Sequence, residues 1–416
     1  MSMVEEATRP GAVDVDRLRA DFPVLRREVN GRPLIYLDSA ASAQKPQSVI
    51  DAELGCYQHY YANVHRGVHT LSQEATTAFE GARTEAQRFL NAPSEREVIF
   101  LRGVTEAINL VAHSFVAPRV GPGDEILVTH MEHHSNIVPW QLVCERTGAT
   151  LRVVPIDDNG DVDLETVRGM IHERTRLVSV VHVSNALGTV NPVAEIAAMA
   201  RAEGVPVLLD GAQAAPHLPV DVQELGVDFY AFSGHKAYGP TGIGVLWGRY
   251  EHLAGMVPYQ GGGDMIRHVS FEGTEYAEPP ARFEAGTPNI AGAIGLGEAL
   301  RYIEAIGRER IAAREEELVG HAAEAIAAVP GVQLIGRPQR RAGAVSFIME
   351  GTHPNDVAML LDEQGIAIRA GHHCAQPLME RYGVPATARA SFGVYNTHDE
   401  VESLVVALEK VRRLFG

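Results

Sequence analysis

The sequence predicts an α/β protein in which a large domain with a mostly parallel β-sheet is followed by a smaller α+β domain. Short apolar runs alternate with helical patterns from Leu34 to Gly244, which is typical of parallel strands joined by crossover helices. The run at residues 177–183 is almost continuously apolar and rich in β-branched residues, as expected of a strand covered on both faces. After Ile290 long helices precede short strands, which indicates the second domain.

The expected elements are short apolar runs bounded by turn residues, and stretches with helical periodicity. In the large domain, strands are expected at residues 33–40, 98–100, 125–129, 151–155, 177–183, 205–209 and 227–232. Helices are expected at residues 47–60, 72–90, 163–171 and 192–203, after a disordered first dozen residues and a short helix at 13–20. In the smaller domain, helices are expected at residues 291–306, 308–329, 355–364 and 399–414, and strands at 332–335, 344–349 and 366–368.

The composition indicates a soluble globular protein. The chain has 416 residues, with 36 basic and 53 acidic side chains and a formal net charge of −17. This charge disfavours binding to nucleic acid or to an anionic membrane, so neither is expected as a partner. No apolar stretch is long enough to span a bilayer, and no basic region followed by an apolar core opens the chain, so no signal peptide is expected.

The cysteines indicate a reducing compartment. Cys56, Cys144 and Cys374 have no metal-like spacing, and an odd number of thiols cannot all be paired within the chain. A cytoplasmic protein with free thiols is the simplest interpretation.

A carboxylate and a lysine follow two of the expected strands. The run at residues 205–209 ends at Asp210, and the run at 227–232 leads through Ser-Gly-His to Lys236. Open α/β sheets place their ligand sites at such strand ends. A lysine amine can form a Schiff base with an aldehyde cofactor, and pyridoxal phosphate also needs a carboxylate at its ring nitrogen. Asp210 and Lys236 together therefore predict a pyridoxal phosphate site, although either residue alone is more often a turn or surface residue.

Neighbouring residues strengthen the prediction of a phosphate site. Ser233 and His235 can donate hydrogen bonds to a phosphate, and the glycine-rich segment at 239–244 lets the backbone come close. A second phosphate-binding feature is the turn with Gly103 and Thr105, which lies between a strand and a helix whose N-terminus carries a partial positive charge. Thr105 is equally suited to be an ordinary N-cap, so this turn alone is a weak signal.

These motifs carry a resemblance to a known family. DGAQA, which begins at Asp210, and FSGHK-x-YGPTGIG, which ends at Gly244, resemble the pyridoxal 5'-phosphate site of class V aminotransferase-type enzymes. Among these, the match to the SUF-type (group II) cysteine desulfurases is close. The resemblance extends from about Asp21 to the end of the chain, and at least six motifs follow the order found in the family.

The resemblance implies PLP fold type I, with a mostly parallel seven-stranded sheet flanked by helices. It places a large PLP-binding domain at residues 31–290. A small C-terminal α+β domain is expected at residues 291–416, and an N-terminal segment at residues 1–30 is expected to pack on it.

A cluster of histidines follows the strand at residues 125–129. His130, His133 and His134 lie within five residues, which is compatible with a metal site. The His-Glu-x-x-His order of zinc proteases is absent, however, and no metal is expected. The resemblance instead implies that His133 stacks on the cofactor ring and takes part in proton transfer, and that Thr105 belongs to the phosphate-binding turn.

The resemblance assigns further roles at the site. It implies that Gln213 bonds to the phenolic oxygen of the cofactor and that Asn185 bonds to the substrate carboxylate or the ring oxygen, although Asn185 also suits a simple turn. Thr287 is expected to touch the cofactor phosphate of the neighbouring subunit, which implies an obligate homodimer. His65 and Arg66 are expected to line the active-site mouth near the dimer interface, while their composition equally allows a solvated loop.

The segment RAGHHCAQP at residues 369–377 contains the third cysteine. A free cysteine is most often a small buried apolar residue, and a Cys–His zinc site is a second candidate that lacks another cysteine nearby. A polar loop with an arginine and two histidines is a setting typical of reactive thiolates. The segment resembles the RxGHHCAxP nucleophile loop of group II cysteine desulfurases, which implies that Cys374 attacks the substrate sulfur. Arg389, with Arg369 as a second contact, matches the arginine that holds the substrate carboxylate.

The resemblance therefore implies a homodimeric, PLP-dependent cysteine desulfurase. L-cysteine would be converted to L-alanine, with a persulfide formed on Cys374 and sulfur passed to a SufE-type or SufU-type acceptor for iron–sulfur cluster assembly. A selenocysteine lyase would share every motif. Another PLP enzyme, such as a transaminase or kynureninase, is a further alternative, which Cys374 in its loop disfavours. A catalytically silent scaffold subunit is another, which the intact set of Lys236, Asp210 and Cys374 disfavours.

Overall fold

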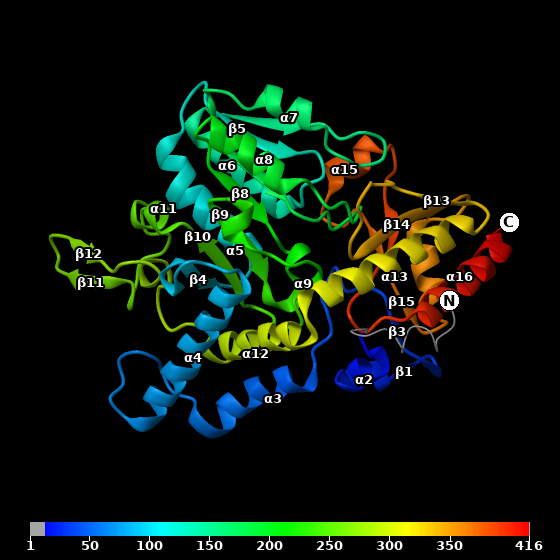
Figure 1. Ribbon diagram of the computed structural model, residues 1–416, viewed down its shortest axis with the longest axis horizontal. Helices are drawn as coiled ribbons and strands as arrows, with labels where there is room; N and C mark the ends of the chain where they lie inside the picture. The colour runs from blue at the N-terminus through cyan, green and yellow to red at the C-terminus, as the bar shows by residue number, and fades with distance from the viewer. Residues whose placement is uncertain (1–12, 416) are drawn as a thin grey trace.

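A seven-stranded sheet forms the centre of the larger part of the molecule (Figure 1). The computed structural model describes residues 13–415, so the expectation for the first dozen residues lies outside the described part. In spatial order the strands are β4 (Val98–Leu101), β10 (Gly244–Gly248), β9 (Phe229–Ser233), β8 (Val207–Asp210), β7 (Thr175–Val181), β5 (Glu125–Thr129) and β6 (Thr150–Val154). β10 is antiparallel to both of its neighbours, and the other pairs are parallel. The predicted mostly parallel seven-stranded sheet is confirmed.

Both faces of this sheet are covered by hydrophobic cores. Neighbouring side chains along a strand point to opposite sides, so they enter different cores. On β4, Phe100 belongs to one hydrophobic core and Ile99 to the other. On β5, Leu127 and Ile126 divide in the same way. Helices cover the faces; they are α4 (Thr70–Phe89), α5 (Val104–Val111), α6 (Val138–Thr147), α7 (Leu164–Met170), α8 (Val193–Ala202), α9 (Ala214–His217), α10 (Val222–Leu225), α11 (Tyr250–Ala254) and α12 (Ile290–Ile306).

The smaller part is built on a four-stranded antiparallel sheet. Its spatial order is β13 (Val332–Leu334), β14 (Ala344–Met349), β17 (Thr387–Ser391) and β16 (Arg369–Gly371). Its helices are α13 (Arg308–Ala328), α14 (Pro354–Asp362), α15 (Gln376–Arg381) and α16 (His398–Phe415). β13, β14 and β17 share a third hydrophobic core with α13, α14 and α16, which includes Leu318, Phe347 and Leu404, whereas Leu378 and Met379 of α15 belong to the first core. The α+β pattern predicted for the C-terminal part is therefore present.

The remaining elements lie at the edges of the two parts. They are α2 (Val15–Ala20), β1 (Glu28–Val29), β2 (Arg32–Pro33), α3 (Gln47–Gly55), the π-helical turn Cys56–Tyr60, β11 (Ile266–Val269) and β12 (Thr274–Tyr276). The helix expected at residues 47–60 thus ends in a π-helical turn. The hairpin of β11 and β12 projects from the large-sheet part in Figure 1.

The strand expected at the start of the large domain pairs elsewhere. β3 (Ile35–Tyr36) is parallel to β15 (Ile366–Ala367), and Leu37 belongs to the core of the smaller part. An apolar run predicts a strand but not its pairing partner, because that partner is more than 300 residues away in sequence.

Helix α12, which the sequence groups with the second domain, packs against α3 and α4 on the large-sheet side (Figure 1). The approach to α4 is close: a Cβ added to Gly297 would lie 2.9 Å from Cα of Ala82. Glycine in the middle of this helix therefore has a packing reason. The sequence changes near Ile290 from alternating strands and helices to long helices, but α12, which begins there, still packs on helices of the large-sheet part.

The N-terminal segment contacts both parts of the molecule. Arg19 donates to Glu400 of α16 at 2.7 Å. Phe22 is fully buried and packs edge-on against the rings of Tyr238, Tyr302 and Tyr395. These contacts connect the segment to the C-terminal helix and to the wall between the two parts.

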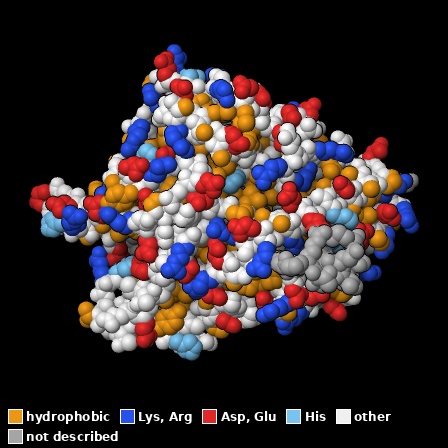
Figure 2. Space-filling model, viewed as in Figure 1, with side chains coloured by type: hydrophobic (Ala, Val, Ile, Leu, Met, Phe, Trp, Pro, Cys, Tyr) orange, Lys and Arg blue, Asp and Glu red, His pale blue; other side chains and the backbone are white. Residues whose placement is uncertain are grey.

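The surface carries charges of both signs. Figure 2 shows Asp and Glu side chains distributed among Lys and Arg across one face of the molecule. Within residues 13–415, none of the helices has the length and apolar character needed to cross a membrane.

The contact between α12 and α4 generates a stability prediction. Gly297→Ala should lower the free energy of unfolding by about 1–3 kcal/mol, because the added methyl group would overlap the Ala82 backbone. Gly320→Ala in the exposed interior of α13 meets open space and should raise stability by about 0.5–1 kcal/mol. Urea unfolding midpoints of the two variants measure this, and equal shifts of the same sign would contradict it.

Candidate active site

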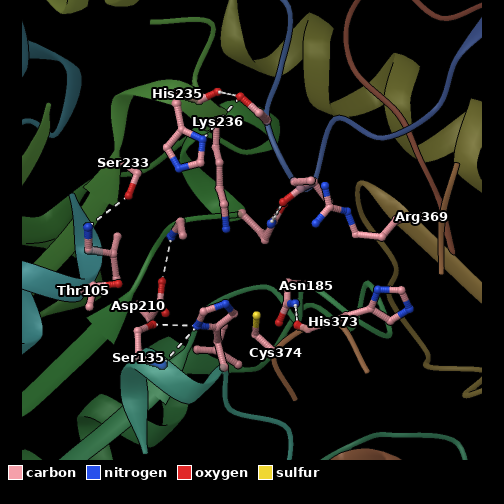
Figure 3. Close-up of a pocket in the computed structure, with 18 of the residues that line it drawn as sticks. Thr105, Ser135, Asn185, Asp210, Ser233, His235, Lys236, Arg369, His373 and Cys374 are labelled. Atoms are coloured by element: carbon pink, nitrogen blue, oxygen red, sulfur yellow. Dashed lines mark hydrogen bonds between the residues drawn. The ribbon is translucent and has the colours of Figure 1, made fainter. Parts of the chain in front are cut away.

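A pocket of about 300 Å³ lies at the carboxyl ends of the parallel strands, where the smaller part closes over the large sheet (Figure 3). Most of the residues predicted from the sequence line it. They are Thr105, His133, Asn185, Asp210, Gln213, Ser233, His235, Lys236, Arg369, Cys374 and Arg389. A volume of this size is typical of small-molecule and cofactor sites.

The strand directions explain this convergence. Asp210 is the last residue of β8, and Lys236 lies in the turn that follows β9. Asn185 follows β7, His133 follows β5, and Thr105 follows β4. Because β4, β5, β7, β8 and β9 run in the same direction, the residues after them meet at one edge of the sheet.

Lys236 and Asp210 face each other across the pocket floor. Figure 3 shows the Lys236 side chain reaching into the centre of the pocket. Burial lowers the pKa of Lys236, and the Asp210 carboxylate opposes that shift only in part. Burial also raises the pKa of Asp210, although one of its oxygens accepts a hydrogen bond from the Ala212 N–H at 2.9 Å. Burial thus disfavours the charged form of both groups, and a bound ligand of opposite charge would favour that form again.

Donors from a separate loop hold the turn that carries the lysine. The His235 carbonyl accepts hydrogen bonds from the Ala43 N–H and the Lys45 Nζ, each at 3.0 Å, and from the Ser42 hydroxyl at 3.3 Å. The turn beside Lys236 is thereby fixed to the segment that follows β3.

The start of α5 brings groups suited to a phosphate to the pocket that contains Lys236. The Ser233 hydroxyl accepts a hydrogen bond from the Val104 N–H at 2.9 Å, which joins the end of β9 to the start of α5. Gly103 has a positive φ of 152°, and a Cβ there would lie 2.9 Å from the Ser233 oxygen, so only glycine fits this turn. The exposed Thr105 hydroxyl and the helix N-terminus are then open to an anion.

His133 is held as a neutral imidazole. Burial, and then the nearby Lys236, lower its pKa to about 3. Its Nδ1 accepts a hydrogen bond from the Ser135 N–H at 3.1 Å, so the neutral ring carries its proton on Nε2. Among residues 13–415, no cluster of three His, Cys, Asp or Glu side chains is arranged to hold a metal ion.

Gln213 reaches the pocket from the loop after β8. Its side-chain nitrogen donates to the Ala40 carbonyl at 2.8 Å, which orients the amide. The second hydrogen on this nitrogen is available to an acceptor in the pocket.

Two arginines from the smaller part form the opposite wall. Arg389 on β17 is buried and donates to the Asn185 carbonyl at 2.9 Å. Burial lowers its pKa to about 10, so it stays charged at neutral pH. Arg369 on β16 is half-exposed, and Figure 3 shows it on the Asn185 side of the pocket, across from Thr105 and Ser233.

The loop with Cys374 is anchored through its backbone. The Cys374 carbonyl accepts from the His134 N–H at 2.7 Å, and the His373 carbonyl accepts from the Asn185 side chain at 2.6 Å. His373 and Cys374 both have φ of 53°, a left-handed conformation that non-glycine residues rarely adopt. The thiol itself is exposed at the pocket mouth. The structure thus presents the sulfur while fixing the chain that carries it.

Three predicted residues lie outside this pocket. His65 pairs with Glu80 at 2.8 Å, and Arg66 pairs with Asp264 at 2.8 Å. Thr287 is exposed on a third segment. The segment of Thr287 is joined to the segment of Asp264, because the Gly286 N–H donates to the Gly263 carbonyl at 3.0 Å. The three residues therefore share a separate surface of the chain.

Sequence reasoning missed several residues that build the pocket. Ser42 and His373 line it, and Ser135 orients His133. Asp38 pairs with both Arg369 and Arg389. Asp38 lies within the strand predicted at residues 33–40, directly after its apolar run, as Asp210 directly follows the run at 205–209, and this position was the available signal.

Comparisons with known proteins agree with this site. The aminotransferase class-V family model matches residues 35–404. A cysteine desulfurase of Klebsiella pneumoniae (strain 342) is 56% identical over 403 residues, which cover 97% of this chain and 99% of that protein. The crystal structure of the cysteine desulfurase CsdA (S-sulfonic acid) from Escherichia coli is similar with a TM-score of 0.90 at 41% identity, covering 97% and 99% of the two chains. A C-DES variant with glycine covalently linked to its PLP cofactor has a TM-score of 0.80 at 26% identity, covering 96% and 99%.

The fold and the pocket define an enzyme of the class V aminotransferase family, with PLP fold type I and pyridoxal phosphate as its cofactor. Within this family the chain belongs to the cysteine desulfurases.

The pocket residues fit this cofactor. Asn185 Oδ1 and Arg389 Nε are buried and have no hydrogen-bond partner among the described residues, which indicates a wall built for a polar ligand. Lys236 offers an amine, Asp210 offers a carboxylate, and the first turn of α5 offers donors to a phosphate.

The buried histidines generate a pH prediction. Burial lowers the pKa of His133 and His373 to about 3 and that of His182 and His235 to about 4. Between about pH 4 and 6.5 the unfolded chain therefore binds more protons, so stability should be full above pH 6.5 and fall on acidification. Glu132, whose pKa burial raises to about 7, opposes this trend, as do Asp210 and Glu400, whose pKa values burial also raises.

Urea midpoints measured from pH 7 to 4.5 at constant ionic strength check the prediction. His182→Gln, away from the pocket wall, should reduce the slope of midpoint against pH. A midpoint that is constant over this range would contradict the assignment.

Proposed function

We propose that this enzyme converts L-cysteine to L-alanine and keeps the sulfur as a persulfide on Cys374. The observation that carries the proposal is that one pocket holds an exposed cysteine, a buried lysine and two arginines. A transaminase needs the lysine and an arginine but has no use for a thiol presented at the pocket mouth. The similarity to cysteine desulfurases over nearly the whole chain supports the same reaction.

Each pocket residue has a separate role in the proposed reaction. When bound, pyridoxal phosphate supplies an aldehyde for the substrate amine and a ring that accepts electron density. Arg389, with Arg369, binds the substrate carboxylate and so orients the α-carbon. The lowered pKa of Lys236 raises its share of neutral amine, which removes the α-proton. His133, neutral with its proton on Nε2, would lie against the bound ring and could donate that proton.

The sulfur transfer step belongs to Cys374. Its thiolate forms a bond to the substrate sulfur while the bond between that sulfur and the substrate β-carbon breaks. The electron pair of the broken bond stays with the three-carbon fragment, which takes up protons and leaves as L-alanine. Cys374 is left as a persulfide, and no external oxidant or reductant is needed.

The exposed position of Cys374 supports delivery of the persulfide to a second protein. We propose a SufE-type or SufU-type acceptor in iron–sulfur cluster assembly, as the resemblance of residues 369–377 to the SUF-type (group II) loop implies. A cytoplasmic location fits the free thiols and the acidic surface.

The nucleophile is tested by replacing Cys374. Cys374→Ala should lower alanine release from L-cysteine by about a hundredfold or more, because the sulfur acceptor atom is removed. Cys144→Ala, a half-buried thiol outside the pocket, should leave the rate unchanged. Release of alanine and sulfide in the presence of a thiol reductant measures both variants.

The same assay with L-selenocysteine separates the alternative function. Selenium leaves more easily, so a selenocysteine lyase should keep that activity in Cys374→Ala. Unchanged rates on both substrates would contradict the nucleophile assignment, and a colourless protein that binds no pyridoxal phosphate would indicate a silent scaffold.

We also propose that two copies of the chain form a homodimer through the surface near Thr287. Residues 63–69, 260–264 and 282–289 are joined there by the Arg66–Asp264 pair and by the hydrogen bond from the Gly286 N–H to the Gly263 carbonyl. Val68 is 93% exposed and Tyr57 is 59% exposed. Tyr57 contacts the ring of Tyr61, which is also exposed, and exposed apolar side chains of this kind on the segment before residues 63–69 support an interface. A second copy would bring its Thr287 to the cofactor phosphate, with His65 and Arg66 at the pocket mouth.

A double replacement tests this interface. Tyr57→Asp with Val68→Asp should convert the dimer to a monomer and weaken PLP retention at least fivefold, because a charged surface is costly to bury. Met359→Asp, at an apolar position on α14 that is 68% exposed, should change neither property. Sedimentation and the bound-cofactor absorbance measure the outcome, and a variant that stays dimeric would contradict the proposed surface.

A further inference from the structure

The two arginines of the pocket stand directly opposite each other. Arg369 on β16 and Arg389 on β17 are register partners in the antiparallel sheet. Like charges at such positions repel each other, and Arg389 is buried, which strengthens the repulsion. The pair therefore needs a compensating negative charge within the structure.

Asp38 supplies this charge. Its carboxylate accepts from Nε and Nη2 of Arg369 at 3.0–3.2 Å, and its Oδ1 accepts from Nη2 of Arg389 at 3.2 Å. Arg369 and Arg389 line the pocket and Asp38 does not, so its carboxylate contacts the guanidinium groups without lining the ligand space.

The backbone holds Asp38 in this position. Asp38 forms a parallel β-bridge to Ser391. The Ser391 N–H donates to the Leu37 carbonyl at 2.8 Å, and the Ser39 N–H donates to the Ser391 carbonyl at 3.3 Å. Ser391 lies two residues beyond Arg389 on β17. The carboxylate is thus fixed to the strand whose charge it balances.

This arrangement occupies donors that a ligand carboxylate would use. The Nε and Nη2 edge of Arg369 is the fork that pairs with a carboxylate through two hydrogen bonds, and Asp38 already fills it. On Arg389, Nη1 and Nη2 have partners, whereas the buried Nε has none among the described residues. The three groups together leave one net positive charge facing the pocket.

We propose that Asp38 is a positioning residue that limits the affinity of the pocket for the substrate carboxylate, by holding Arg369 and Arg389 and neutralising one of their two charges. The inference rests on the proposed function in so far as these arginines bind the carboxylate. A moderate affinity suits a site that must release a carboxylate product, L-alanine, after each turnover. If Asp38 only holds the arginines in place, removing its charge should weaken the binding of a carboxylate ligand. If its charge limits the affinity, removing that charge should tighten the binding.

The test uses a substrate analogue that cannot react. 3-Mercaptopropionate has the carboxylate and thiol of cysteine without the amine, and 3-mercaptopropionamide is its neutral counterpart. Calorimetry on the reduced holoenzyme gives both dissociation constants without any turnover. Asp38→Asn should tighten 3-mercaptopropionate at least fivefold, lower the KM for L-cysteine, and leave the amide unchanged.

Matched variants control the experiment. Asp124→Asn removes an Asp–Arg pair of similar exposure outside the pocket. Asp124 and Arg176 are 18% and 48% exposed, and Asp38 and Arg369 are 15% and 50% exposed. Asp124→Asn should leave both dissociation constants unchanged. Asp38→Ser, a second neutral replacement, should tighten the acid in the same direction. The bound-cofactor absorbance verifies that each variant is folded.

Weaker or unchanged binding of 3-mercaptopropionate in both Asp38 variants would overturn the proposal, and so would a wild type that does not distinguish the acid from the amide. The proposed reaction fails separately, if the wild type releases no alanine from L-cysteine while the calorimetric shift is still observed.

Discussion

The parallel pairing of β8 with its two neighbours is the constraint on which the rest of the site depends. Asp210 ends β8, and β7 and β9 run beside it in the same direction, so the residues that follow all three strands emerge at one edge. The Lys236 amine and the Asp210 carboxylate are thereby buried on one pocket floor, where each has its charged form disfavoured. A shift of the register by one residue would turn these side chains to the other face of the sheet.

The smaller part completes the site from the other side. Its arginines and Cys374 reach residues of the large sheet through backbone groups: Arg389 donates to the Asn185 carbonyl, and the Asn185 side chain donates to the His373 carbonyl. Asn185 is therefore a junction between the two halves as well as a pocket residue. The oxygen of its side chain is buried and has no hydrogen-bond partner among the described residues.

Much of the fold and the site could be predicted from the sequence, because the signals were local. Apolar runs that end on Asp210 or lead to Lys236 predict strands and the edge at which their ends meet. What could not be predicted was pairing over long distances. The partner of β3 lies at β15, and α12 packs on α4, since periodicity defines the apolar face of an element but not what covers it. Asp38 was missed for the same reason: its arginine partners are more than 300 residues away.

The loop of Cys374 has a consequence for how this enzyme can evolve. The contacts that hold the residue itself involve its backbone, and its side chain is exposed. The scaffold and the reactive atom are thus specified by different parts of the same residue. A lineage can exchange the side chain at this position and alter the chemistry at the pocket mouth without rebuilding the loop, while the left-handed backbone favours glycine or asparagine among the alternatives.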